Sequence, residues 1–272
     1  MKKSGKVTFG TILFFLYATF ILFLFLQIGF HSLRTPQDLL SNMMGRPERF
    51  TFDAYRHIFA VDRFYRFMWS SVVVLTGSMF LNVVLSSLAA YGIGRYQFKL
   101  RKHTLMYFLI GLMFPIQLSV VPLFLLMRDL QLMNTHMSVI LISGVSLSLP
   151  ILLLNNFFRG IPNEFYESAK IDGASELRIF IQVMFPLAIP VIASMIIITS
   201  LGVWNQFFLP MLFLQSEHLR TLPLALLRYR GNLQFLDRAL AATVMSAFPI
   251  LIVYFFFSKK IISGITEGGV KH

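Results

Sequence analysis

The chain has 272 residues, of which 56% are hydrophobic and 13% are charged, and its formal net charge is +12. A water-soluble domain of this length could not keep so much apolar area off its surface, so part of its solvent must be lipid. It has no cysteine, which excludes disulfides, thiolate metal sites and a cysteine nucleophile.

The first apolar block runs from Val7 to Phe30 and follows Lys2, Lys3 and Lys6. It exceeds the apolar core of a signal peptide and lacks a small-residue cleavage pattern, so we expect a retained span. Uncharged blocks of similar length recur, and about 20 helical residues suffice to cross a membrane. In a single transmembrane domain over residues 1–272, the expected spans are 9–30, 69–94, 104–127, 137–158, 186–212 and 239–260.

The expected fold class is therefore all-α, a polytopic membrane protein with six transmembrane helices. Six spans place both termini on one side, and the polar segments 31–67 and 215–237 on the other. Of the 24 Lys and Arg residues, 13 fall on the termini side and 11 opposite, but every lysine lies on the termini side. The bias of basic residues toward cytoplasmic loops thus favours cytoplasmic termini.

Several spans contain prolines, each of which removes a backbone donor and breaks the hydrogen-bond ladder locally. Lipid tolerates such breaks only where neighbouring helices satisfy the freed carbonyls, so we expect the spans to pack against other protein. Small residues four apart, as in Ser86 and Ala90 or Ala242 and Ser246, favour close helix packing. The prolines are Pro115, Pro122, Pro150, Pro190, Pro210 and Pro249.

Catalytic signatures are missing from the chain. It has no H-E-x-x-H, no G-x-S-x-G and no G-x-x-x-x-G-K-[ST] motif, and its histidines are scattered rather than paired at ligand spacing. We therefore expect no enzyme and no metal site. The expected span cores also carry no Lys, Arg, Asp or Glu, which disfavours a proton-driven or ion-driven carrier.

The segment 159–185 is polar enough to leave the membrane, yet it has the spacing of ordered helices. Pro162 and Asn163 mark a helix start, and Asp172 and Gly173 mark a turn, because glycine adopts backbone angles closed to other residues. We expect a helix-turn-helix on the cytoplasmic face with an apolar ridge available for docking. The second helix would present Leu177, Ile181 and Met184 on one side.

This segment resembles the E-A-A, G and I-x-L-P pattern of permease subunits of bacterial ABC-type importers, through Glu167-Ser168-Ala169, Gly173 and Phe185-Pro186. Longer strings resemble carbohydrate importer permeases of the maltose and multiple-sugar type, in particular the shorter maltose permease subunit. The resemblance covers nearly the whole chain from Trp69 to His272. The strings are IPNEFYESAKIDGAS, FPIQLSVVPLFLL, LGVWNQFFLP, TLPLAL and KKIISGITEGGVKH.

The resemblance implies a permease subunit of an ATP-driven sugar importer in a bacterial inner or plasma membrane. Such a subunit forms half of the translocation pathway and couples it to a separate ATPase. Its partners would be membrane lipid, a second permease, two ATPase subunits and an extracytoplasmic sugar-binding protein, with no nucleic acid. The chain itself would hold no cofactor, because ATP-Mg binds to the ATPase. The implied coupling residues are Glu164, Glu167, Ala169, Asp172 and Gly173.

Amide side chains offer a second candidate site, because amides bond sugar hydroxyls. We retain Asn205 and Gln206, the latter standing where family members often have Glu, as lining residues of the substrate pathway. Interhelical bonding or interfacial anchoring is the better explanation for the other polar and indole side chains in the spans. These are Asn82, Gln117, Asn155, Asn156 and Trp204.

Other interpretations remain open at this stage. The loop could merely link two spans, and the tail from Gly264 to His272, which resembles a tail that reaches the ATPase dimer interface, could be a frayed terminus. The whole chain could be a secondary carrier or channel, an intramembrane enzyme, or an ABC importer permease for glycerol phosphate or an oligopeptide. Transport by the chain alone would distinguish a carrier from an importer subunit.

Overall fold

The computed structural model describes residues 9–42 and 45–269, and from residue 253 onward it describes the helix path only. The described residues form helices and no strand, so the expected all-α class is confirmed for this part of the chain. The chain divides into two units that we treat separately. The first unit is Met1–Tyr65 with Ala225–Pro249, and the second is Arg66–Leu224 with Ile250–His272.

Four helices are long and apolar enough to cross a membrane singly: Gly10–His31, Phe64–Arg95, Glu176–Trp204 and Leu233–Ile252. Two helix pairs reach that length only together. Arg101–Met113 and Ile116–Asp129 meet at a bend of 93°, and His136–Gly144 and Ser148–Gly160 at one of 42°. The structure therefore has four to six candidate membrane spans, and the expected six is the count in which each bent pair crosses once.

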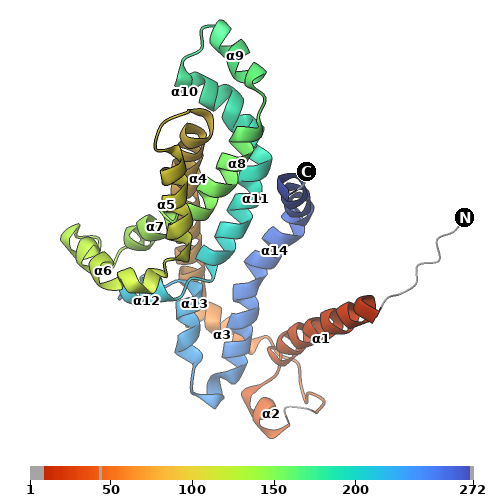
Figure 1. Ribbon diagram of the computed structural model, residues 1–272. Helices are drawn as coiled ribbons and strands as arrows, with labels where there is room; N and C mark the ends of the chain where they lie inside the picture. Colours follow the sequence, from red (N-terminus) through yellow and green to blue (C-terminus); the bar gives the residue numbers. More distant parts are fainter. Residues whose placement is uncertain (1–8, 43–44, 270–272) are drawn as a thin grey trace, which may run out of the picture. The chain divides into compact units, whose positions relative to one another are not determined.

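Helices α4 to α13 form most of the second unit, and Figure 1 shows α9 and α10, which carry the candidate coupling loop, at one end of α8 and α11. A π-helical segment, η2, joins α10 to α11 without a break. The expected span 186–212 is not one helix: the long helix begins already at Glu176 and ends at Trp204, and the rest of the expected span falls in the break and in α12. The bounds are α4 Phe64–Arg95, α5 Arg101–Met113, η1 Ile116–Ser119, α6 Val120–Asp129, α7 His136–Gly144, α8 Ser148–Gly160, α9 Asn163–Ile171, α10 Glu176–Ile179, η2 Phe180–Met184, α11 Phe185–Trp204, α12 Phe208–Phe213, η3 Glu217–Leu219 and α13 Leu222–Ala225.

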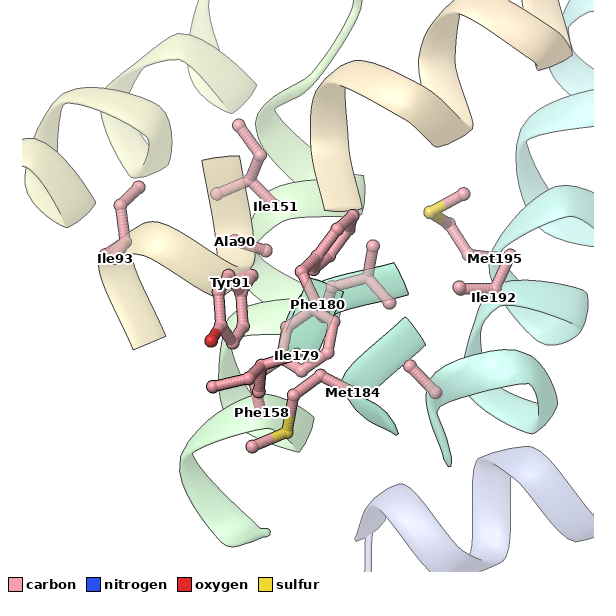
Figure 2. Close-up of a cluster of buried hydrophobic side chains, with 12 residues drawn as sticks. Ala90, Tyr91, Ile93, Ile151, Phe158, Ile179, Phe180, Met184, Ile192 and Met195 are labelled. Carbon is pink, nitrogen blue, oxygen red and sulfur yellow. The ribbon is translucent and has the colours of Figure 1, made fainter. Parts of the chain in front are cut away.

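The main core of the second unit lies where α4, α8 and the α10–α11 helix meet (Figure 2). The ring of Tyr91 lies 5.7 Å from that of Phe158 and 5.1 Å from that of Phe180, centroid to centroid. Ser86 and Ala90 are fully buried, as the small-residue spacing indicates. A Cβ on Gly94 would lie 3.2 Å from the Cβ of Phe158, so glycine permits this close approach of α4 and α8.

Two helical spans are interrupted, one by a proline and the other at a site where a side chain satisfies the freed carbonyls. Pro115 lies at the bend between α5 and η1, where its missing N–H ends the ladder. Between α7 and α8, the side-chain amide of Asn82 donates to the carbonyl oxygens of Gly144 at 3.2 Å and Ser146 at 3.0 Å. Asn82 therefore satisfies backbone groups that the break frees, which confirms its expected role as interhelical glue.

Two buried aspartates, Asp38 and Asp62, make polar contacts within the first unit. Arg34 and Asp38 form a two-pronged pair, with Nε to Oδ2 at 2.7 Å and Nη2 to Oδ1 at 2.8 Å. Asp62 accepts a hydrogen bond from Tyr229 and lies 3.6 Å from the guanidinium of Arg228. The helical bounds in this unit are α1 Phe9–His31, α2 Pro36–Ser41, α3 Asp53–Ala60, η4 Leu226–Tyr229, η5 Leu233–Phe235 and the start of α14 Leu236–Gly269.

Candidate functional site

The helix α9 begins at Asn163 and ends in a glycine turn, as the sequence predicts. Gly173 has φ +76, in the left-handed region that favours glycine. The N–H of Gly173 donates to the carbonyl of Lys170, and the N–H of Ala174 to that of Ala169, both at 3.1 Å. This pair of bonds is the Schellman arrangement, which satisfies the last carbonyls of a helix and fixes the direction of the chain that follows.

Apolar side chains project outward around this turn. Ile171 is 86% exposed, Leu177 is 61% exposed and Phe165 is 48% exposed. Ile171 was not singled out by the sequence analysis, although an apolar residue directly before a glycine turn is a usable signal. Met184 was expected to share a face with Leu177, but it is buried. The π-helical segment η2 causes this difference, because it shifts the helical register between the two residues.

The implied coupling residues divide into two groups. Ala169 packs, half-buried, against the main core, so its small size already has an explanation within the chain. The remaining four lie at the surface of α9 and its turn and leave the loop open to a second protein. These exposed residues are Glu164, Glu167, Asp172 and Gly173.

Glu176 ties α9 to the end of α4, and no motif in the sequence marks it as a functional residue. Its carboxylate accepts hydrogen bonds from the Tyr96 hydroxyl at 2.5 Å, the Tyr166 hydroxyl at 2.7 Å and the Lys170 ammonium at 2.6 Å. The hydrogen bond from Lys170 to this carboxylate, and a second to the Tyr166 hydroxyl, raise the pKa of the Lys170 ammonium. Ser175 caps the start of α10, because its hydroxyl oxygen accepts a hydrogen bond from the backbone N–H of Arg178.

Arg95, the last residue of α4, makes two further contacts with α9. Its guanidinium donates to Oδ1 of Asn163 at 2.6 Å and lies 3.9 Å above the centroid of the Tyr166 ring. The cation over the ring adds an electrostatic attraction to the hydrogen bond. Helix α9 is thus held at its start and along its length by side chains from α4 and α10.

The two candidate pathway residues lie in the break between α11 and α12. Asn205 caps the end of α11, and its amide donates to the carbonyl of Leu201 at 2.9 Å. The side-chain oxygen of Gln206 accepts from the backbone N–H of Phe208 at 3.2 Å. Both amides therefore serve the backbone at this break, and each retains hydrogen-bonding capacity for a sugar hydroxyl.

The other polar side chains of the spans do not form one site. Asn155 is buried, and Trp204 is buried beside Asn205, whereas Gln117 and Asn156 are exposed. Within the described ranges, no three His, Asp or Glu side chains gather as a possible metal site. The side chains of the tail from Gly264 to His272 lie outside the described part of the chain.

Residues 82–265 match the family model described as the binding-protein-dependent transport system inner membrane component. The chain belongs to this family. The matched range includes α9, its glycine turn and the α11–α12 break. The expected importer permease is thereby confirmed at the level of the family, whose members are transport proteins rather than an enzyme class. The chain is accordingly a membrane protein and a component of a binding-protein-dependent transport system.

Two curated relatives of this inner membrane component extend over nearly its whole length. It is 34% identical to the arabinooligosaccharides transport system permease protein AraQ of Halalkalibacterium halodurans, over 96% of this chain and 95% of that protein. It is 31% identical to the diacetylchitobiose uptake system permease protein NgcG of Streptomyces coelicolor, over 94% and 86% respectively. Each name describes the cargo of that relative.

A solved structure shares the fold of this inner membrane component. It is described as the crystal structure of a bacterial ABC transporter involved in the import of the acidic polysaccharide alginate. The match has a TM-score of 0.81 at 23% sequence identity and covers 92% of this chain and 94% of the other. At this identity the likeness concerns the arrangement of helices.

Proposed function

We propose that the chain is a permease subunit of an ATP-driven importer of sugars, with short oligosaccharides as the cargo class. The observation that carries the cargo assignment is its similarity, over at least 94% of its length, to permeases named for arabinooligosaccharide and diacetylchitobiose transport. The spans would form half of the pathway beside a second permease. Spans without charged side chains suit a neutral cargo.

The energy would come from two ATPase subunits that bind ATP-Mg, and the cargo from an extracytoplasmic binding protein. The membrane topology proposed is six spans with cytoplasmic termini, in which each bent helix pair crosses once. Asn205 and Gln206 would contact the cargo near the α11–α12 break. The lysine distribution supports this orientation, since every lysine of the chain falls on the termini side of that topology.

The loop of α9 and the Gly173 turn would dock on the ATPase. Exposed Phe165, Ile171 and Leu177 support this role, because apolar side chains displayed around a rigid turn suit a partner groove. Closure of the ATPase dimer would move the loop and switch the spans from inward-facing to outward-facing. Switching this equilibrium from about 1:99 to 99:1 takes roughly 5.5 kcal/mol of differential free energy.

The transport assignment is tested in liposomes that contain both permeases, with the binding protein outside and with or without the ATPase. We expect uptake only when the ATPase and internal ATP are both present. Uptake by the permeases without any ATPase would contradict the proposal and favour a secondary carrier. Thermal shifts of the cognate binding protein with arabinooligosaccharides, chitobiose and glycerol phosphate then test the cargo class, and stabilisation by glycerol phosphate alone would reject sugar.

The docking role is tested at Gly173, which has open space around its Cβ position. We expect Gly173→Trp to insert in the membrane but to lose co-purification with the ATPase. Gly173→Asn should retain association, because asparagine tolerates the left-handed region. The matched control is Gly231→Trp, since Gly231 has φ +82 and equally open surroundings in a different loop. Normal ATPase association of Gly173→Trp would argue against docking at this turn.

A further inference from the structure

We infer that Glu176 is a positioning residue that joins the coupling helix α9 to two spans at once, so that movement of α9 is transmitted to both α4 and α11. This inference rests on the proposed docking of the α9 loop on an ATPase. It concerns how the loop is attached within this chain, whereas docking concerns the surface that the loop presents to a partner.

Glu176 lies at the start of a candidate membrane-spanning helix. It is the first residue of α10, and α10 continues through η2 into α11 as one helix from Glu176 to Trp204. A force on the Glu176 carboxylate therefore acts on the end of a membrane-spanning helix. Because the helix is continuous, no flexible loop lies between that carboxylate and the span.

Three side-chain donors converge on the Glu176 carboxylate. Oε1 accepts from Tyr166 and Lys170, which are four residues apart on one side of α9. Oε2 accepts from Tyr96, which directly follows the last residue of α4. One carboxylate thus bridges α9 on one oxygen and the end of α4 on the other.

The attachment of α9 depends on several contacts together rather than on one ion pair. The Lys170 and Glu176 side chains are 56% and 44% exposed, and a single ion pair at such exposure contributes little. The Tyr166 ring, however, is also covered by the Arg95 guanidinium, which is bonded to Asn163. The Glu176 carboxylate therefore belongs to a network of six side chains, in which each contact restricts the others.

These contacts would make α9 and the two spans move together. If α9 could swing away from α4 and α10, closure of the ATPase would move the loop and leave the spans in place. ATP would then be hydrolysed without uptake. The network holds α9 against α4 and α10 and so opposes ATP hydrolysis without uptake. None of its side chains belongs to the exposed apolar surface of Phe165, Ile171 and Leu177.

The experiment measures sugar uptake per ATP hydrolysed by the complete transporter, with its binding protein, in proteoliposomes. Tyr96→Phe removes one hydroxyl from the network and leaves the docking surface unchanged. We expect uptake per ATP to fall about fivefold, the factor that corresponds to one hydrogen bond of about 1 kcal/mol. Co-purification with the ATPase should equal that of the wild type.

Two controls separate positioning from a general structural role. Tyr107→Phe makes the same chemical change on α5, where the residue is 73% exposed, and should leave the ratio unchanged. Lys170→Arg retains a cationic donor and should preserve the ratio, whereas Lys170→Met should lower it. The inference would be overturned if uptake per ATP were the same in Tyr96→Phe and Tyr107→Phe. It would also be overturned if uptake per ATP were the same in Lys170→Arg and Lys170→Met.

Failure of the proposed function would look different. If the wild-type complex shows no ATP-dependent uptake, the importer assignment fails and the positioning role falls with it. If wild-type uptake is normal but Tyr96→Phe loses the ATPase during purification, the network is only structural and the positioning role is rejected.

The distance between α9 and the end of α4 can also be measured directly. The chain has no cysteine, so Gln97→Cys and Ser168→Cys can be spin-labelled without background. We expect a narrow distance distribution between the two labels in the assembled transporter. Glu176→Gln, which removes the negative charge, should broaden it. An equal width in both proteins would show that Glu176 does not hold α9 in place.

Discussion

The hydroxyl of Tyr229 donates a 2.7 Å hydrogen bond to Oδ2 of Asp62, joining segments 167 residues apart in the sequence. Both residues are buried, and burial together with the Asp62 hydrogen bond raises the pKa of the Tyr229 phenol. The phenol therefore stays protonated and remains a donor. This contact fixes the segment after α3 to η4 within the first unit.

Loss of that hydroxyl should destabilise the first unit. We expect Tyr229→Phe to lower the free energy of unfolding by about 1–3 kcal/mol, because a buried carboxylate oxygen loses its donor. The measurement is a denaturant titration of the purified subunit in detergent. Tyr65→Phe, at a residue that is 49% exposed, is the matched control. Equal stability of the two variants would contradict the importance of this contact.

The Arg34–Asp38 pair predicts a pH dependence. The hydrogen bond from Arg34 lowers the pKa of the Asp38 carboxyl below its usual value of about 3.9. A carboxyl with a lowered folded-state pKa contributes stability that is complete above its ordinary pKa and is lost as pH falls through the lowered value.

We therefore expect the melting temperature of the wild type to exceed that of Asp38→Asn by a constant amount from pH 8 to about pH 5, and the difference to shrink below about pH 4. Melting is followed by intrinsic fluorescence in detergent. A difference that already declines between pH 7 and pH 5 would show that another group controls the stability.

Asn82 provides a test of how the broken α7–α8 pair is maintained. We expect Asn82→Ala to lower stability by about 1 kcal/mol, a typical value for an interhelical hydrogen-bonding side chain in a membrane protein. Asn156→Ala removes the same amide from an exposed position of α8 and should have little effect. Unfolding in a graded detergent mixture measures both, and an effect of the same size at Asn156 would count against the bridging role of Asn82.

Cysteine labelling decides between four and six crossings. With six spans, a membrane-impermeant reagent added outside the cell should label Asp129→Cys, at the last residue of α6, and Gln234→Cys. Lys99→Cys should react only from the cytoplasmic side. If α5 and α6 form a re-entrant pair at their 93° bend, Asp129→Cys will instead share the accessibility of Lys99→Cys.

The sequence identified the parts of the structure that depend on residue type in a local window. The length of apolar blocks indicates the spans, and glycine after a short polar helix indicates the Gly173 turn, because both signals follow from backbone physics within a few residues. Pro115 likewise marks a break, although a proline alone does not determine the 93° angle between the two helices.

The contacts of Glu176 could not be predicted in this way. An acidic residue after Ser175 is typical of any first helical turn, and its partner Tyr96 is 80 residues away in the sequence. The buried pair of Arg34 and Asp38 poses the same difficulty, since an arginine and an aspartate four apart usually indicate an exposed helix surface. Pairing across the fold is decided by packing, which a local pattern does not contain.

The segment η2 has one further consequence. A π-helical turn holds one residue more than an α-helical turn. The π-helical turn in η2 therefore determines in which direction the side chains of α10 point around the axis of α11. Deleting one residue between Phe180 and Met184 would restore the regular helix and rotate the preceding segment by about 100°. Glu176 would then point away from Tyr96. The direction in which α10 faces relative to α11 is therefore set by the number of residues in η2, and not only by the residues that contact it.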